Sequence, residues 1–145
     1  MNIIIAAIKA AKKYYNKENY YHAMRVVAYV AENNLIPKDM KEKCVALAIM
    51  HDLEEDTSFE YFRDIDEICY DTYIENCICL LTRDKEVVPY EDYLSNIKDK
   101  YNSYPEVYWV KIADMKDHLS ETDTLTNTLK EKYLKALPCL LGSVK

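Results

Sequence analysis

Glycine is almost absent from this chain: it occurs once in 145 residues, at Gly142, and proline occurs four times. Tight β-hairpins need glycine or Asn-Gly pairs at positive φ, so the chain offers few places to reverse between strands. Half of the residues are apolar, which is enough for a hydrophobic core, and the length is that of one domain. We therefore expect an all-α fold, a single compact bundle of about six or seven helices over residues 1–145.

Apolar residues recur at helical spacing along most of the sequence. An acidic segment, EEDTS at 54–58, is expected to break this pattern, with a short helix after it, and Pro138 stands towards the end of the last helix. The longer helices are expected at about 3–15, 20–32, 38–53, 65–81, 90–101, 105–119 and 124–137.

The charge balance limits the class of ligand. The formal net charge is −6 and no long run of lysine and arginine reverses it locally. Binding to a nucleic-acid backbone requires the opposite sign, so we expect no nucleic-acid partner. A compact anionic ligand can still bind where a metal ion neutralises part of its charge. The sequence leaves the oligomeric state open, a homo-oligomer included.

The five cysteines lack the CxxC pairs of a zinc site. We expect Cys44, Cys69 and Cys79 to be buried, reduced thiols, which favours a cytoplasmic protein. The N-terminal IIIAAI run lacks the basic region and the cleavage site of a signal peptide. No apolar stretch approaches 18 residues, so we expect no membrane span.

Histidine is scarce, and two of the three histidines adjoin acidic residues. His51 begins the segment HDLEED, which follows an apolar helical pattern. Like charges gathered at one point repel and raise carboxylate pKa values unless a cation lies among them. A His-Asp pair alone is more simply interpreted as the polar end of a helix, and a single helical histidine such as His22 as a core residue.

The wider set of residues favours a metal site. His22, the pair His51-Asp52 and a distant acid, Asp114, are expected on three different helices. Two imidazoles and two carboxylates make a mixed nitrogen and oxygen site, which suits Mn²⁺, Fe²⁺, Zn²⁺ or Mg²⁺ rather than a thiophilic ion.

Lys111, Asp114 and His118 share one face of a predicted helix, because their spacing is i, i+3, i+7. A carboxylate between a cation and an imidazole indicates the wall of a site. A solvated stripe is the alternative for Lys111 and His118, and the spacing alone does not decide between the two.

The order H…HD…D resembles the HD superfamily of metal-dependent phosphohydrolases. HDLEEDT at 51–57 is similar to the HDxxEDT motif of the RelA/SpoT-type guanosine polyphosphate hydrolase domains and their small single-domain relatives. VKIAD at 110–114 is similar to their VKLAD, and LLTRDKEVVPYEDYL at 80–94 resembles the segment between the two motifs. The resemblance extends from about Tyr20 to Leu119.

The resemblance implies that His22, His51, Asp52 and Asp114 hold one divalent ion, for which we expect Mn²⁺. It implies that Glu55 and Asp56 position and activate the attacking water. Metal binding lowers the pKa of water, and a nearby carboxylate can accept its proton.

Lys111 would help to stabilise charge on the phosphate oxygens, and His118 is the other candidate substrate-binding residue. His118 stands where the family usually has asparagine. The segment before His22 is shorter than in the family, and Lys13 and Lys17 are the basic residues near it.

The sequence therefore predicts hydrolysis of a phosphate ester or pyrophosphate on a small-molecule nucleotide. Removal of the 3′-pyrophosphate from a guanosine alarmone is the most specific form of this prediction. Three alternatives stay open: a phosphatase of another nucleotide, a non-catalytic module that senses a metal or nucleotide, and a structural helical domain. The pair Glu55-Asp56 argues against the sensing module, because binding alone does not need a water-activating pair.

Overall fold

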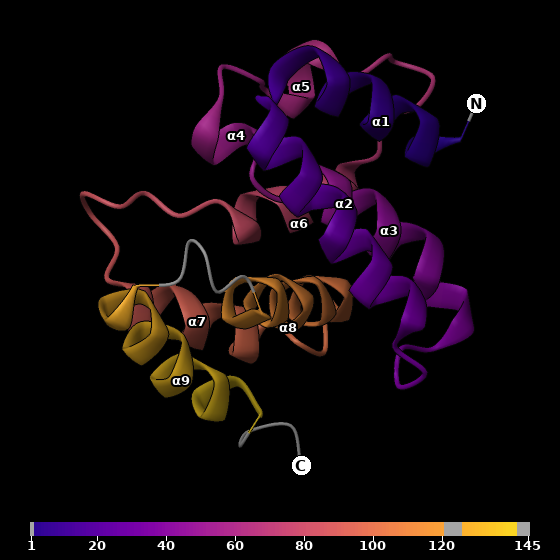
Figure 1. The fold of residues 1–145 in the computed structure, drawn as a ribbon. Helices are drawn as coiled ribbons and strands as arrows, with labels where there is room; N and C mark the ends of the chain where they lie inside the picture. Colours follow the sequence, from indigo (N-terminus) through magenta and orange to yellow (C-terminus); the bar gives the residue numbers. More distant parts are fainter. Residues whose placement is uncertain (1, 121–125, 142–145) are drawn as a thin grey trace.

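The computed structural model describes residues 2–120 and 126–141, and within these ranges it contains helices and no strand. The all-α prediction is confirmed. Seven of the helices have ten or more residues, in agreement with the expected six or seven (Figure 1). The elements are α1 (Ile3–Tyr14), α2 (Lys17–Glu32), a 3-10 turn (Lys38–Met40), α3 (Lys41–Met50), α4 (Leu53–Asp56), α5 (Tyr61–Asp64), α6 (Thr72–Leu81), α7 (Tyr90–Asp99), α8 (Pro105–Ser120) and α9 (Asn127–Leu141).

Asparagine and aspartate side chains set the starts of three helices. The side chain of Asn2 accepts a hydrogen bond from the backbone N–H of Ile4, and that of Asn16 accepts one from Asn19. Such caps satisfy backbone donors that have no partner inside the helix. Asn16, two residues after the end of α1, therefore caps the start of α2. This start places His22 in the second turn of α2.

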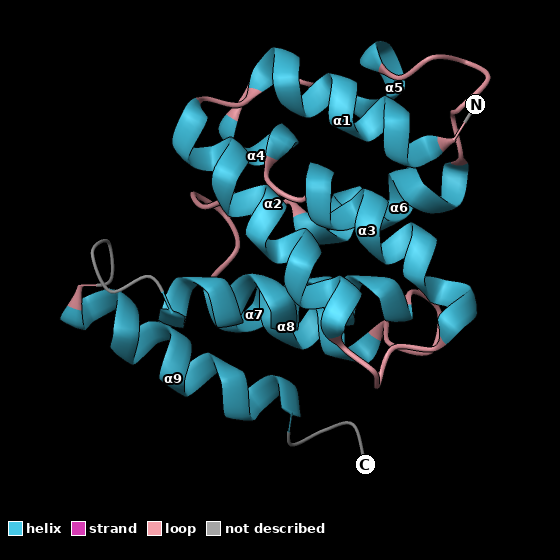
Figure 2. Cartoon of the chain, turned by 45° about the vertical axis from the view of Figure 1, so that its right-hand side comes forward, coloured by secondary structure: helices cyan, strands magenta, loops and turns pink. Residues whose placement is uncertain are grey.

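Two central helices, α3 and α8, carry the core. The residues from Ala46 to Met50 are all buried, because α3 packs against α1 and α2 on one side and against α6 and α8 on the other. A helix that is apolar all round belongs in the interior. Helix α8 packs against α2, α3 and α6, and α9 covers α7 and α8 (Figure 2). The HD pair thus directly follows one of these two helices, α3, and Asp114 lies on the other, α8.

Several predicted boundaries are wrong. The helix expected over 20–32 begins at Lys17, and the one expected over 38–53 is the 3-10 turn followed by α3, which ends at Met50. The acidic segment after Leu53 is not a plain break, because Leu53–Asp56 form the single-turn helix α4. The helix expected over 65–81 begins only at Thr72, where the Asp71 side chain accepts a hydrogen bond from Tyr73 N–H. The last helix continues through Pro138 to Leu141, and its expected start near 124 lies outside the described residues.

The cysteine prediction is correct for two of three positions. Cys44 and Cys69 are buried, but Cys79 is exposed and Cys77 is buried in its place. Residues two apart on a helix point to different faces, so the register of α6 decides which cysteine enters the core. Among the described residues, no helix is both long and apolar enough to cross a membrane.

Candidate metal centre and its cavity

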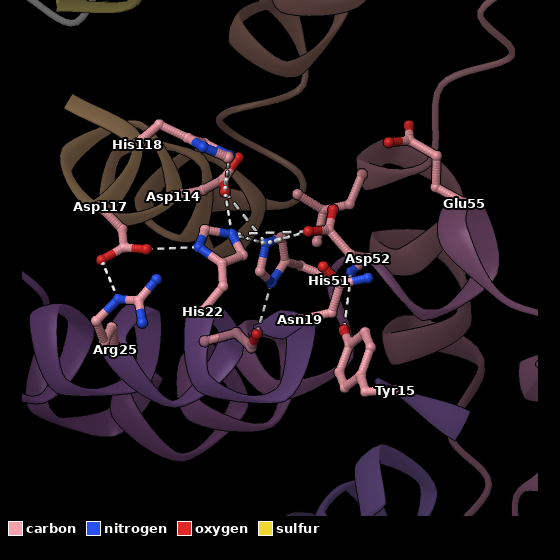
Figure 3. Close-up of polar contacts among 12 residues, drawn as sticks. Tyr15, Asn19, His22, Arg25, His51, Asp52, Glu55, Asp114, Asp117 and His118 are labelled. Carbon is pink, nitrogen blue, oxygen red and sulfur yellow. Dashed lines mark hydrogen bonds and ion pairs between the residues drawn. The ribbon is translucent and has the colours of Figure 1, made fainter. Parts of the chain in front are cut away.

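The structure brings the four predicted ligands together. His22 comes from α2, His51 and Asp52 follow the end of α3, and Asp114 comes from α8. One ligand atom from each of these residues lies within 4.8 Å of the other three, and the side chains point at one another (Figure 3). His51 follows His22 by 29 residues in the sequence, and Asp114 follows it by 92. Segments that are distant along the chain thus converge on one point.

Both imidazoles have their outer nitrogen engaged by an acceptor. The Nδ1 atom of His51 lies 2.6 Å from the carbonyl oxygen of Ala48, and Nδ1 of His22 lies 2.6 Å from Oδ2 of Asp117. A carbonyl or carboxylate oxygen only accepts, so Nδ1 of each ring carries the proton. The two Nε2 atoms face inward, 3.2 Å apart. This is the orientation that a metal ligand needs.

The inner atoms of the cluster require a positive charge. Oδ1 of Asp114 lies 2.9 Å from Nε2 of His22 and 3.2 Å from Nε2 of both His51 and His118. Since Nδ1 of His22 and His51 is protonated, their Nε2 atoms present either a second proton or a bare lone pair. Lone pairs facing a carboxylate oxygen repel it unless a cation lies between them.

The pKa directions agree with this requirement. Burial lowers the pKa of His51, but Asp52 and Asp114 outweigh it and hold that pKa well above its usual value. Burial also lowers the pKa of His22, but the hydrogen bond to Asp114 outweighs this effect, so that the pKa of His22 is raised. Against the effect of burial, Lys111 and His51 hold the pKa of Asp114 well below its usual range. A divalent ion can replace protons in such a cluster, so these residues fit a metal ion.

Two residues that the sequence did not predict hold His22 in place. Asp117 is almost fully buried, and its Oδ1 accepts a hydrogen bond of 2.8 Å from Nε of Arg25 while Oδ2 contacts His22. Burial would raise the pKa of Asp117, but the hydrogen bonds from Arg25 and His22 lower it. Asp117 follows Asp114 by three residues on α8, and this shared helix face was the one available sequence signal.

Tyr15 fixes the backbone of the HD pair. Its hydroxyl donates to the carbonyl oxygen of Ile49 at 2.9 Å and accepts from the backbone N–H of Asp52 at 3.2 Å. It therefore links the last turn of α3 to the start of α4. Nothing in the sequence distinguishes Tyr15 from the thirteen other tyrosines.

A cavity of about 180 Å³ opens beside the cluster. One part of its wall is formed by His51, Asp52 and Asp114, and another by the acidic pair of α4. Apart from Leu81, the rest of the wall is basic and aromatic, and of these residues only Lys111 and His118 were predicted. The lining residues are His51, Asp52, Glu55, Asp56, Leu81, Arg83, Lys85, Tyr90, Tyr93, Lys111, Asp114, His118, Lys132 and Tyr133.

Glu55 and Asp56 face this cavity without belonging to the four-residue cluster. Figure 3 shows the Glu55 carboxylate apart from the histidines. Its Oε1 accepts a hydrogen bond of 2.9 Å from the backbone N–H of Arg83, and its Oε2 lies 3.9 Å from Nζ of Lys85. Burial, with the charges of Asp52 and Glu55, raises the pKa of Asp56.

Lys111 and His118 lie in the cavity wall rather than on an open stripe. Lys111 is buried, and its Nζ lies 2.8 Å from Oδ2 of Asp114 and 5.2 Å from the ring centroid of Tyr93. The His118 ring stacks on Tyr133 at 4.8 Å and 6°. The Lys111 ammonium is thus already paired with the candidate ligand, which it orients.

No family model matches the chain, and no curated protein sequence matches it significantly. The resemblance to the HD superfamily therefore stays a prediction that rests on the motifs. What the structure adds is a buried His22, His51, Asp52 and Asp114 group that could hold a metal ion, next to a cavity with acidic and basic walls.

Proposed function

We propose that the chain is a metal-dependent phosphohydrolase of the HD type that acts on a small-molecule nucleotide. One observation carries the proposal: four metal-ligand side chains converge beside a cavity that also contains a separate acidic pair and a basic wall. A bound divalent ion would act as a Lewis acid and lower the pKa of water. Mn²⁺ is the ion that we propose, because the mixed nitrogen and oxygen set suits it.

The acidic pair provides the base. Glu55 and Asp56 line the cavity but are not needed to hold the ion, so a carboxylate oxygen of either residue is available to accept a proton from water. The Glu55 side chain is oriented by the backbone N–H of Arg83. We propose Glu55 as the principal base because this hydrogen bond engages Oε1, whereas Oε2 makes a longer contact, of 3.9 Å, with Nζ of Lys85.

The basic wall favours an anionic substrate. The chain as a whole carries a formal charge of −6, yet Arg83, Lys85, Lys111 and Lys132 all line the one cavity. Gathering like charges costs free energy, which phosphate oxygens in the cavity would offset. Lys111 is neutralised by Asp114, so the other three cations are the groups that we propose to bind phosphate.

The 3′-pyrophosphate of a guanosine alarmone is the specific substrate that the motif resemblance favours, and we keep it as the first substrate to test. Phosphatase activity on another nucleotide is the alternative within the same chemistry. A cytoplasmic location, with a nucleotide as the small-molecule partner, belongs to the same proposal.

A hydrolysis screen with Mn²⁺ tests the proposal. Guanosine tetraphosphate and ordinary nucleotides would be incubated with the protein while the released phosphate or pyrophosphate is followed. Glu55→Gln should keep the metal and lower turnover on the order of 10²-fold or more, the scale of a lost general base. Absence of metal-stimulated hydrolysis on all of these substrates would refute catalysis, and nucleotide binding without hydrolysis would support the sensing module instead.

A further inference from the structure

A second cavity lies between α7 and α9, next to the first. Its volume is about 390 Å³, and the residues that line it include Leu94 and Ser95 of α7 and Ala136 of α9. Tyr90 and Lys132 line both cavities. This second cavity, which we call the α7–α9 groove, therefore adjoins the metal cavity, with Tyr90 and Lys132 in the walls of both.

The sizes of the two cavities fit different parts of a nucleotide, the phosphate in the smaller cavity and the base and sugar in the larger. The metal cavity offers about 180 Å³, whereas sites for small organic molecules typically measure about 300–1,000 Å³. A phosphate or pyrophosphate group fits the smaller cavity, but a base and sugar do not fit there as well. The α7–α9 groove, at about 390 Å³, is within the typical range.

The lining of the groove combines apolar surface with cations. Leu94, Ala136 and the Tyr90 ring offer apolar contacts. Three lysines, Lys98, Lys132 and Lys135, and one carboxylate, that of Glu91, also line the groove. Among the described residues, neither Lys98 nor Lys135 forms an ion pair. An apolar floor with unpaired ammonium groups complements a planar base that carries a further phosphate.

Lys132 stands at the junction of the two cavities. Its Nζ lies 4.2 Å from the ring centroid of Tyr90 and 5.5 Å from that of Tyr133. Burial and the positive charges of Arg83, Lys111 and Lys85 lower the pKa of Lys132. An anion bound at this junction would remove that unfavourable charge interaction.

The basic residues that precede His22 line two other cavities. Lys13 and Lys17 line cavities of their own, and neither of these cavities shares a lining residue with the metal cavity. Their ammonium groups lie over the neighbouring rings of Tyr14 and Tyr21. Lys13 and Lys17 therefore line cavities separate from the metal cavity.

We propose that the α7–α9 groove is the nucleoside subsite: it binds the base and sugar of a nucleotide whose scissile phosphate lies in the metal cavity, with Lys132 between the two. The position of the scissile phosphate rests on the proposed function, but binding of the nucleoside in the groove does not require turnover. Lys98 and Lys135 then contact phosphate on the far side of the sugar.

Calorimetric titration of the chelator-treated, dialysed protein tests the groove without hydrolysis. The probes are guanosine tetraphosphate, ATP and inorganic pyrophosphate. The variant Lys98→Ala/Lys135→Ala should bind guanosine tetraphosphate roughly 10-fold more weakly, as expected for two lost surface ion pairs. It should bind ATP about as the wild type does, because ATP carries phosphate on one side of the sugar only. The control Lys100→Ala/Lys130→Ala removes the same charge from exposed positions at the end of α7 and on α9 that do not line the groove. It should leave nucleotide binding unchanged.

A steric variant tests the groove independently of charge. Ser95 is exposed and lines the groove, so Ser95→Trp should fill it while leaving the core intact. We expect weaker binding of both nucleotides and unchanged binding of inorganic pyrophosphate, with an unchanged melting temperature as the check on folding.

The outcomes separate this inference from the proposed function. If the wild type hydrolyses nucleotides and both groove variants bind and hydrolyse them equally well, the groove is not the subsite, and the hydrolase proposal stands. If the groove variants lose nucleotide binding but the wild type shows no turnover, the subsite stands and catalysis is refuted. If the wild-type protein binds no nucleotide with or without metal, both proposals are overturned.

Discussion

Asp117→Asn should weaken metal binding although Asp117 is not one of the four ligands. The carboxylate of Asp117 accepts two hydrogen bonds, from Nδ1 of His22 at 2.6 Å and from Nε of Arg25 at 2.8 Å. An amide has one oxygen, so asparagine can keep only one of these bonds. Its NH₂ group then faces a donor on the other side.

The expected loss of metal affinity follows from the two orientations that the asparagine amide can take. If the amide oxygen stays with Arg25, its NH₂ group opposes the Nδ1 proton of His22 and favours the tautomer whose Nε2 cannot bind a metal. If the oxygen stays with His22, the negative charge that makes the imidazole a stronger donor is still lost. Loss of such an outer partner typically lowers metal affinity about 10- to 100-fold, which corresponds to about 1.4–2.8 kcal/mol.

Calorimetric titration with Mn²⁺ measures this change directly. The matched control is Asp99→Asn, which removes the same charge from an exposed position at the end of α7. The control should bind the ion as the wild type does, and ¹⁵N NMR of the imidazoles should show the altered His22 tautomer in Asp117→Asn alone. A dissociation constant for Asp117→Asn within about twofold of the wild type, well below the expected 10- to 100-fold, would refute the positioning role.

Two further predictions concern the scaffold. Tyr15→Phe leaves the buried carbonyl of Ile49 and the N–H of Asp52 without their partner, so it should lower the free energy of unfolding in urea by about 1–3 kcal/mol; an unchanged free energy would contradict this. In the native protein at pH 8, N-ethylmaleimide should label Cys79 before Cys44 and Cys77, since burial raises the pKa of both buried thiols to about 12. Equal labelling rates by peptide mass spectrometry would contradict the register of α6.

The fold was predictable at the level of helices because glycine scarcity and apolar spacing act locally. The boundaries were not, because they depend on side chains that compete for backbone groups. Asp71 caps α6 and shortens the helix expected from residue 65, and the acidic residues after Leu53 form a helical turn that spacing alone did not indicate.

The candidate ligands were predictable because histidine is rare in this chain, and His22, His51, Asp52 and Asp114 stand in a recognisable order. The residues around them were not, because their roles depend on contacts between distant helices. Arg25 and Asp117 meet across 92 residues, and Lys132 reaches the cavity only because α9 packs on α7 and α8. Sequence spacing contains no information on such contacts.

Metal content is the measurement that tests the central claim most directly. Purified wild-type protein, loaded with Mn²⁺ and desalted, should retain about one ion per chain by elemental mass spectrometry, because four donor atoms meet within 4.8 Å. His51→Gln and Asp52→Asn should lose most of it, whereas His118→Asn, which lies outside the four-residue group, should keep it. Equal metal content in the wild type and in both ligand variants, each shown to be folded by circular dichroism, would contradict the four-ligand site and the hydrolase proposal that depends on it.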